Sequence, residues 1–477
     1  MRNQPDTTAV DSTVAHLDHV GLLGEVKATV AGLFGRRETR SNFWDLVTGL
    51  LLELPRANCW TIGEAVGHEG PHRLQHLLSR AAWDAEAVLA AVAGWVAGQL
   101  ADRLDGPVVL VVDETGDEKS STDAVGAASQ YSGSLGGVGV CQVAVHLSLA
   151  SPVGHAVIGR RLYLPADWAA DDERRTLAGV PDETAFATKP DLALALLAEA
   201  VAAGVRADYV AADEVYSSRA FRTGCRRLDL AYVAATPANR QVTTSDGRKR
   251  TCADAVALVP AGAWARMRTG TATKGAKDYD WAMLAIEPDD TPTGTRPDGR
   301  PWPGGHSVLL ARRHRYTRKI SFFRCWTPNP VPLADLVAVV CARWHVEEDF
   351  QLSKRTVGLD QGQVRTSDLL APLVDRRPDR LRLPGHRRPP RTPSHHRPRP
   401  TRPDPHHLPR TATPAHRHRP TPTPPRPRPR QPLVTLATTT PGHRPTMPPS
   451  LEHLRRPSGL NITNYNCRDY AAFVAVR

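Results

Sequence analysis

The stretch Pro107-Val-Val-Leu-Val-Val-Asp113-Glu-Thr-Gly116 joins an uninterrupted aliphatic run to a carboxylate. Such a run predicts a strand that is buried on both faces. A second stretch, Tyr209-Val-Ala-Ala-Asp213-Glu214, repeats this pattern downstream. Ligand sites of open α/β sheets gather at the carboxyl ends of strands, so Asp113 and Asp213 are candidate site residues. The acidic residues that follow Asp113 fit a surface turn equally well, and that alternative stays open.

A third carboxylate, Glu347, lies in a segment with helical periodicity. Spacings of four and seven residues place Arg343, Glu347 and Lys354 along one stripe of that helix. The stripe is either a solvated, ion-paired surface or a metal-binding acid whose two neighbouring cations hold DNA phosphates. With the two earlier acids, Glu347 completes a set of three carboxylates of the kind that holds two divalent cations for phosphodiester chemistry.

The positive charge of the chain is concentrated at one end. The 477 residues carry a formal net charge of +12. Residues 366–477 alone carry +15, with 21 Arg, no Lys and 6 acidic residues, which leaves −3 for residues 1–365. The body is therefore not basic overall, and any affinity for DNA there must come from local patches.

One local basic patch occurs within the body. It interleaves cations with an aromatic side chain, and its cations are Arg312, Arg313, Arg315, Arg318 and Lys319. Such a cluster can serve as a track for DNA phosphates. It can equally be the charged edge of a sheet, where Arg and Lys discourage pairing with other chains. Both interpretations stay open.

The cysteines and the N-terminus bear on the cellular compartment. The 7 cysteines are scattered and show neither a paired framework nor the close spacing of a zinc site. Reduced thiols in a cytosolic protein are the expectation. The first twenty residues are polar, without the apolar segment of a signal peptide, and no stretch is long and apolar enough to span a bilayer. We therefore expect a soluble, cytoplasmic protein that does not enter the membrane.

Hydrophobic periodicity divides the first half of the chain into segments. Residues 1–20 form a loose leader, and residues 21–104 predict a helical N-terminal domain that is a candidate for DNA binding. Within it, Thr61–Arg80 has the pattern of a helix, a Gly-rich turn and a second helix, which fits either a unit that docks on DNA or an ordinary helical hairpin. Residues 105–230 change to three strands, a helix and a fourth strand, which predicts an α/β fold with a mixed sheet and flanking helices.

The second half continues this core and then changes character. Residues 231–330 are rich in Thr, Gly and aromatic side chains and predict a β-rich insertion. Helical periodicity returns in residues 331–365, which carry the third acid. Residues 366–477 are rich in Pro, Arg and His and cannot bury enough apolar surface to offset the entropy of ordering, so a disordered basic tail is predicted. This tail is either an arm that grips phosphates or GC-rich DNA translated out of frame.

Several motifs in matching order give the chain a resemblance to a known family. They include Val112-Asp-Glu-Thr-Gly116, Phe186-Ala-Thr-Lys-Pro190, Ala212-Asp-Glu-Val-Tyr216, Arg343-Trp-His-Val-Glu-Glu-Asp-Phe-Gln351 and Gln363-Val-Arg365. Over residues 20–365 the chain resembles the DDE-superfamily transposases of bacterial insertion sequences, in the insertion-sequence 701-like group related to the Tyr-Arg-Glu-Lys signature. The Tyr of that signature corresponds to Val340, which departs from the pattern.

The resemblance implies a fold, a site and partners. It implies an RNase H-like core in which Asp113, Asp213 and Glu347 bind two Mg²⁺ ions, with Mn²⁺ as a possible substitute. Arg343 and Lys354 would contact the transposon end. The implied partners are double-stranded DNA, as terminal inverted repeats and as target, and a second copy of the chain on paired ends. The implied location is the nucleoid of the bacterial cytoplasm.

The implied activity is metal-dependent endonuclease cleavage at the transposon ends, followed by strand transfer into target DNA at the same site. Two other functions stay open. An inactive DNA-binding remnant, truncated or frameshifted after residue 365, would account for the tail. A two-metal DNA nuclease with the same core would account for the three acids without strand transfer.

Overall fold

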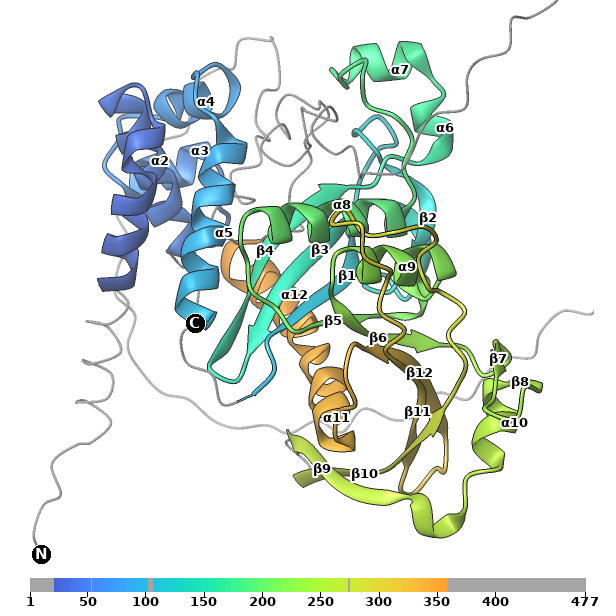
Figure 1. Ribbon diagram of the computed structural model, residues 1–477. Coiled ribbons are helices and arrows are strands. Elements are labelled where there is room, and N and C mark those ends of the chain that lie inside the picture. Colours follow the sequence, from blue (N-terminus) through green and yellow to red (C-terminus); the bar gives the residue numbers. More distant parts are fainter. Residues whose placement is uncertain (1–20, 53, 102–105, 273–274, 359–477) are drawn as a thin grey trace, which may run out of the picture. The chain divides into compact units, whose positions relative to one another are not determined.

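The aliphatic run that precedes Asp113 forms strand β1 (Val109–Glu118), near the middle of a mixed sheet (Figure 1). The computed structural model describes residues 21–52, 54–101, 106–272 and 275–358. The other strands of this sheet are β2 (Ala128–Ser132), β3 (Gly137–Ser151), β4 (Gly154–Leu162), β5 (Tyr209–Ala212), β6 (Ala231–Thr236), β9 (Ala265–Ala272), β10 (Gly275–Ala285), β11 (His306–His314) and β12 (Ile320–Thr327). Their order is β2-β3-β1-β5-β6-β12-β11-β10-β9, with β4 also paired to β3.

The centre of the sheet is parallel and its flanks are antiparallel. β1 runs parallel to β5, and β5 runs parallel to β6. The pairs of β3 with β1, β2 and β4 are antiparallel, as are those that join β6 to β12 and then to β11, β10 and β9. The predicted mixed sheet with flanking helices is confirmed, and the arrangement is consistent with an RNase H-like core.

Helices make up the N-terminal segment and cover the sheet. Residues 21–30 are helical, and the next helices are η1 (Ala31–Leu33), α2 (Arg37–Leu51), α3 (Cys59–Ala65), α4 (His72–Ser79) and α5 (Ala85–Ala101). Those of the core are α6 (Ala166–Ala169), α7 (Asp172–Leu177), α8 (Lys189–Ala202), η2 (Glu214–Tyr216), α9 (Arg219–Arg227), α10 (Cys252–Ala257), η3 (Ala261–Ala263), α11 (Leu333–Ala342) and α12 (Trp344–Val357). α5 packs on β3 and β4, and α2 contacts α12.

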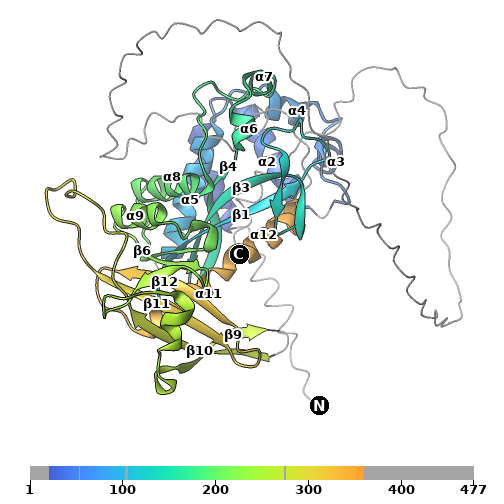
Figure 2. The same ribbon diagram turned by 90° about the vertical axis from the view of Figure 1, so that its right-hand side faces the viewer.

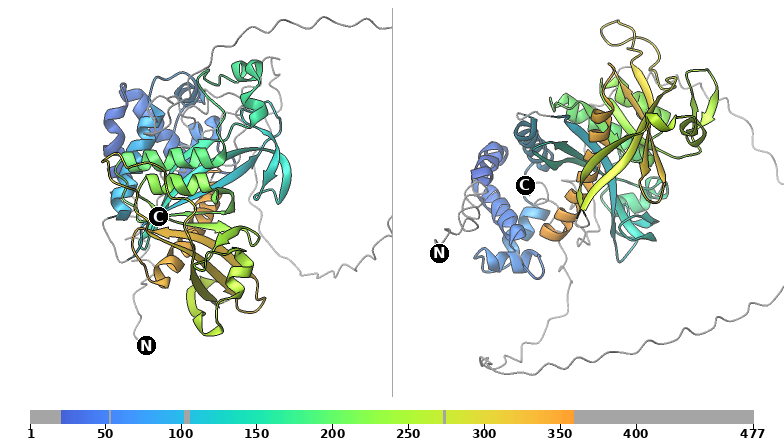
Figure 3. Two further views of the ribbon diagram at one scale, coloured as in Figure 1. Left: turned by 45° about the vertical axis from the view of Figure 1, so that its right-hand side comes forward. Right: turned by 90° about the horizontal axis from the view of Figure 1, so that it is seen from below.

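β1 is buried on both faces, as its aliphatic run predicts. Leu110 and Val112 lie in one apolar cluster with side chains of α8 and α9, while Val109 and Val111 lie in another with side chains of α11. Neighbouring residues of a strand point to opposite faces, so α8 and α9 cover one side of the sheet at β1 and α11 covers the other. Figure 2 and the left view of Figure 3 show α8 and α9 lying side by side along one face.

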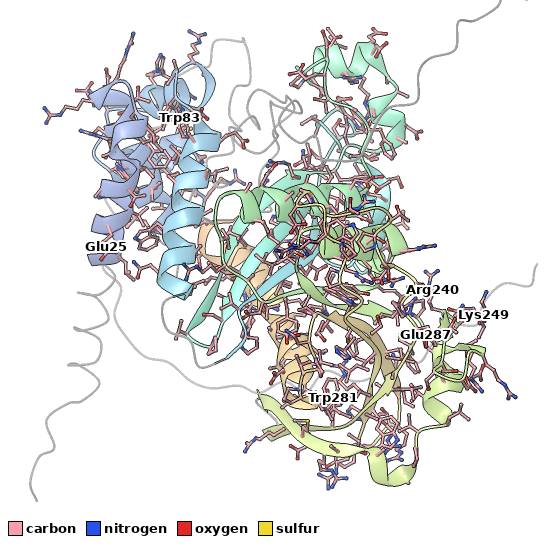
Figure 4. All side chains as sticks on the ribbon, viewed as in Figure 1. Glu25, Trp83, Arg240, Lys249, Trp281 and Glu287 are labelled. Carbon is pink, nitrogen blue, oxygen red and sulfur yellow. The ribbon has the colours of Figure 1, made fainter. Side chains whose placement is uncertain are left out.

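The segment predicted as a β-rich insertion extends the same sheet. Its first strand, β6, pairs in parallel with β5 and so belongs to the centre of the sheet. β12, β11, β10 and β9 then add outward in that order, and only β7 (Gln241–Thr243) and β8 (Lys249–Thr251) form a separate pair among the described strands. Trp281 of β10, labelled in Figure 4, is fully buried in the cluster that also contains Leu336 and Val337 of α11.

The interpretation of the residues after Asp113 as a surface turn is wrong. β1 continues without interruption to Glu118, because its antiparallel partner β3 stays paired from Ala150 to Cys141 after the parallel strand β5 has ended. The three strands, the helix and the fourth strand predicted within residues 105–230 correspond to β1, β3 and β4, to α8 and to β5.

The helix predicted to carry the third acid is divided into α11 and α12 at Arg343. α12 ends at Gly358, whose φ of 60° is in the left-handed region that glycine adopts without strain. Val340, which corresponds to the Tyr of the signature, lies on α11 and is buried. The leader 1–20 and the tail 366–477 lie outside the described residues.

Two predictions that concern the compartment can be compared with the structure. None of the six cysteines within the described ranges is joined in a disulfide, in keeping with the expectation of reduced cysteines. None of the helices in the described ranges combines the length and the apolar character needed to cross a membrane.

Candidate active site

The two aspartates occupy matching positions on neighbouring parallel strands. The last parallel pair joins Val112 to Ala212, so Asp113 and Asp213 follow directly, each on its own strand. Each carboxylate accepts a hydrogen bond from the next backbone N–H, at 2.9 Å for Asp113 and 2.7 Å for Asp213. Adjacent strands lie about 4.8 Å apart, so the two acids are close neighbours where the parallel pairing ends.

Arg343 joins the third acid to the first. Its Nη1 donates to Oδ2 of Asp113 at 3.0 Å, and its Nη2 donates to Oε1 of Glu347 at 3.0 Å. The residue lies between α11 and α12, so the break in the helix places its guanidinium over the centre of β1. Two carboxylates that are separated by more than two hundred residues therefore share one cation.

The electrostatic surroundings of Asp113 are unusual for a carboxylate. Burial raises the pKa of Asp113 to about 7, against the opposing effect of the Arg343 guanidinium, and the charge of Asp213 raises it further. A buried acid with a like-charged neighbour is costly to ionise unless a cation compensates. Such a pair of acids is therefore a place where additional positive charge stabilises the protein.

The three acids have the chemistry of ligands for a divalent cation, but their carboxylate oxygens do not converge on one position in this structure. Carboxylate oxygens are the ligands that Mg²⁺ and Mn²⁺ prefer. Among the described residues, the three side chains whose ligand atoms all lie within 4.8 Å of one another are His155, His345 and Glu348, and not the three acids. Arg343 holds Asp113 and Glu347 at the two ends of its guanidinium.

Lys354 pairs with β1 further along the same face. Its Nζ lies 2.9 Å from Oγ1 of Thr115 and 3.2 Å from Oδ1 of Asp117. Burial raises the pKa of Asp117, while the charge of Lys354 opposes this rise. In this structure the two signature cations, Arg343 and Lys354, both contact acids of the protein, and α12 is thereby fixed along β1.

Glu114 forms a second polar cluster on the opposite face of β1. Lys189, at the start of α8, places its Nζ 3.0 Å from Oε1 of Glu114. The hydroxyl of Tyr216 donates to the other carboxylate oxygen, Oε2. The sequence marks Lys189 and Tyr216 only as members of matched motifs. The structure shows that both bind the side-chain carboxylate of Glu114, the residue next to Asp113.

His146 is a site neighbour that the sequence did not indicate. It is the register partner of Asp113 on β3 and is only 2% exposed. Burial lowers the pKa of His146 to about 3, so its imidazole is neutral. Its ring packs edge-on against Phe350 of α12, at 4.9 Å between centroids. A lone histidine within an apolar strand carries no sequence signal that links it to an acid on another strand.

The basic run divides into an inner and an outer part. The guanidinium of Arg312 lies 5.0 Å from the ring centre of Tyr279, and that of Arg313 lies 3.9 Å from the ring centre of Trp264. The outer part is the exposed turn between β11 and β12, and its cations are Arg315, Arg318 and Lys319. Arg312 and Arg313 are therefore half-buried against aromatic side chains, and the outer three are exposed.

The predicted helix, turn and helix of the N-terminal segment are present as α3 and α4. Gly49 of α2 lies so close to Ile62 of α3 that a Cβ there would overlap its side chain at 2.2 Å. His68, in the turn, is 3.0 Å from the carboxylate of Asp45 on α2. One face of this unit is exposed and polar, and its side chains are His72, Arg73, His76 and Arg80.

A known family matches more than half of the chain. The model of the family described as "DDE superfamily endonuclease" matches residues 29–282. This span contains Asp113 and Asp213 and ends before Glu347. The crystal structure of the NurA nuclease from Sulfolobus solfataricus aligns with 50% of this chain and 72% of its own, at 7% identity and a TM-score of 0.25, and has no bearing on the fold.

A curated relative is similar over a shorter span. The "Probable transposase for insertion sequence element IS701" of Microchaete diplosiphon is 28% identical over 204 residues, which are 41% of this chain and 49% of that protein. The match thus spans about half the length of the relative. Because the family model matches more than half of its residues, the chain belongs to the family of DDE superfamily endonucleases.

Proposed function

We propose that this chain is an insertion-sequence transposase that cuts DNA at the ends of its element and transfers the cut strands to target DNA. One observation carries the proposal: Asp113 and Glu347, from distant segments, lie at the two ends of the Arg343 guanidinium. Asp213 adjoins Asp113 on the neighbouring strand. The family match and the similarity to a probable transposase support the same function.

Asp113, Asp213 and Glu347 would hold two Mg²⁺ ions, or Mn²⁺ in their place. The bound ions would supply Lewis acidity that activates a water or a 3′-hydroxyl and stabilises the leaving oxygen of an in-line displacement. Arg343 keeps two of the acids together and compensates their charge. Once it releases them, its guanidinium is free to contact a phosphate of the DNA.

Exposed cations on two elements are suited to hold the DNA. The turn between β11 and β12 presents Arg315, Arg318 and Lys319, and the exposed face of α4 carries His72 and Arg73. Contacts of this kind bind phosphates without reading sequence, so they would position the duplex. A homodimer on paired transposon ends, in the nucleoid of the cytoplasm, completes the proposal.

The first experiment tests cleavage. We expect DNA with the terminal repeats of the element to be cut in the presence of Mg²⁺ or Mn²⁺, and not with a chelator. Asp113→Asn, Asp213→Asn and Glu347→Gln should each reduce the rate by at least about a thousandfold, because each removes a metal ligand. Asp182→Asn, a change at an exposed acid outside the site, is the matched control and should leave the rate unchanged.

The products separate the remaining functions. Joining of the cut end to a second duplex indicates a transposase, whereas cleavage without joining indicates a two-metal nuclease. Binding of the repeats without any cleavage indicates an inactive remnant. Full cleavage by any of the three site variants would exclude the proposed site.

A further inference from the structure

A second group of metal-ligating side chains lies outside the three acids. His155 is at the start of β4, and His345 and Glu348 are in the first turns of α12. Oε2 of Glu348 lies 2.9 Å from Nδ1 of His345 and 3.5 Å from Nε2 of His155. The two imidazole rings are stacked, with 4.4 Å between centroids and 20° between planes. Two nitrogens and one oxygen thus converge from two elements.

The spacing of these atoms suits one ion. Zn²⁺ binds nitrogen and oxygen at about 2.0–2.2 Å, so tetrahedral ligands lie roughly 3.3–3.5 Å apart. All three ligand atoms lie within 4.8 Å of one another. A nitrogen lone pair lies in the plane of its ring, so one of the two stacked imidazoles must turn out of the stack for both to reach a shared cation.

Asp349 orients one of these ligands. Its Oδ1 is 2.8 Å from Nδ1 of His155, and this hydrogen bond raises the pKa of the imidazole. A bound ion would therefore displace the ring proton at Nε2, which lies 3.5 Å from Oε2 of Glu348. Asp349 is only 5% exposed, and its Oδ2 is buried without a hydrogen-bond partner. A buried carboxylate that holds the far nitrogen of a histidine is the usual outer partner of a metal-binding imidazole.

We propose that His155, His345 and Glu348 bind one Zn²⁺ ion, separate from the cations of the candidate active site. Two imidazole nitrogens favour Zn²⁺ over Mg²⁺, which prefers oxygen. The side chains of His345 and Glu348 are 38% and 48% exposed, so an ion can enter from solvent. Because its ligands come from β4 and α12, the ion attaches α12, the helix that carries Glu347, to the sheet.

The test measures zinc binding by the full chain in excess Mg²⁺. Metal is first removed with a chelator, and bound Zn²⁺ is then measured by equilibrium dialysis with metal analysis. Histidines in residues 366–477 supply a background that is the same in every variant. We expect the unchanged protein to bind one equivalent more than His155→Asn or His345→Asn. His306→Asn, at an exposed histidine on β11, is the matched control and should bind like the unchanged protein.

Two further readouts separate a metal site from a structural contact. Zn²⁺ should raise the melting temperature of the unchanged protein and of His306→Asn, and should not raise that of His345→Asn. Asp349→Asn should keep the extra equivalent with about 10–100-fold weaker affinity. Far-ultraviolet circular dichroism before metal addition establishes that each variant is folded. Equal stoichiometry and equal thermal shifts in the unchanged protein and the two histidine variants would overturn the proposal.

Discussion

Asp113 shows how the surroundings of one residue set its charge. It lies in the middle of a strand, between the buried His146 of β3 and the acid that follows β5. Burial raises its pKa to about 7, and Arg343 only partly opposes this. The folded protein therefore keeps a carboxylate that is costly to ionise at a point where a metal ion would compensate its charge.

The raised pKa of Asp113 gives a pH dependence with a definite sign. An acid whose folded pKa lies above its unfolded value holds its proton more tightly when folded, so stability falls as pH rises from about 4 to about 7. Asp113→Asn removes this loss. Both proteins are measured in the presence of a chelator. The free energy of unfolding of the unchanged protein minus that of Asp113→Asn should be smaller at pH 8 than at pH 4, by on the order of 4 kcal/mol.

Urea denaturation at the two pH values measures this difference. Asp182→Asn, an exposed substitution of the same type, should follow the unchanged protein at both. A constant difference between the unchanged protein and Asp113→Asn across this range would show that the carboxyl ionises freely in the folded state.

At the scale of elements, α12 is the part that completes the site. It packs on β1, β3 and β4 and also contacts α2. Its residues reach three separate groups: Glu347 shares Arg343 with Asp113, Lys354 pairs with Asp117, and His345 stacks on His155. The position of the third acid is thus set by contacts along the whole helix.

The pairing of Lys354 with Asp117 is testable by a double-mutant cycle. Lys354→Met removes the strongest cationic partner of the buried Asp117 carboxylate and leaves Lys119 and Arg160 to compensate it in part, so it should cost about 1.5–3 kcal/mol of unfolding free energy. Asp117→Asn in the same chain should restore most of this loss, and chemical denaturation measures all four proteins. If Lys354→Met lowered the affinity for DNA and left the free energy of unfolding unchanged, the lysine would contribute to DNA binding and not to stability.

At the scale of the whole described unit, a buried ionic network fastens the long connection between β10 and β11 to the core. Asp290 is 1% exposed and accepts from Arg226 at 2.9 Å and from the hydroxyl of Tyr232. Asp289 binds two arginines, Arg222 and Arg324, with two hydrogen bonds each. These residues come from α9, β6 and β12, so the network joins the outer strands to the centre of the sheet.

Removal of Asp290 tests this network. Asp290→Ala leaves the fully buried Arg226 without its carboxylate and should cost about 3–5 kcal/mol of unfolding free energy. Asp298→Ala in the same connection, which removes a carboxylate 47% exposed and 3.8 Å from Arg296, should change it by less than about 0.5 kcal/mol. Urea denaturation of the two variants measures both values. Similar effects of the two changes would contradict a structural role for the network.

Local sequence patterns predicted much of the fold. The aliphatic run before Asp113 predicted a strand buried on both faces, and the repeated motif at Asp213 predicted a companion strand, because burial alone dictates such composition. The order of motifs indicated the family. Patterns of this kind are short in range, and the acidic residues after Asp113 therefore fitted a surface turn where the structure has the longer strand that β3 stabilises.

What the sequence determined by itself is the strand before Asp113, its companion before Asp213, the helical character of the segment around Glu347, and which acids belong to the motifs, because these depend on neighbouring residues. Only the tertiary structure decided that Arg343 bridges Asp113 and Glu347, that Arg312 and Arg313 pack on aromatic rings, and that His155 meets His345. These contacts join residues of different elements, and their partners are set by strand register and helix packing, which no local pattern encodes.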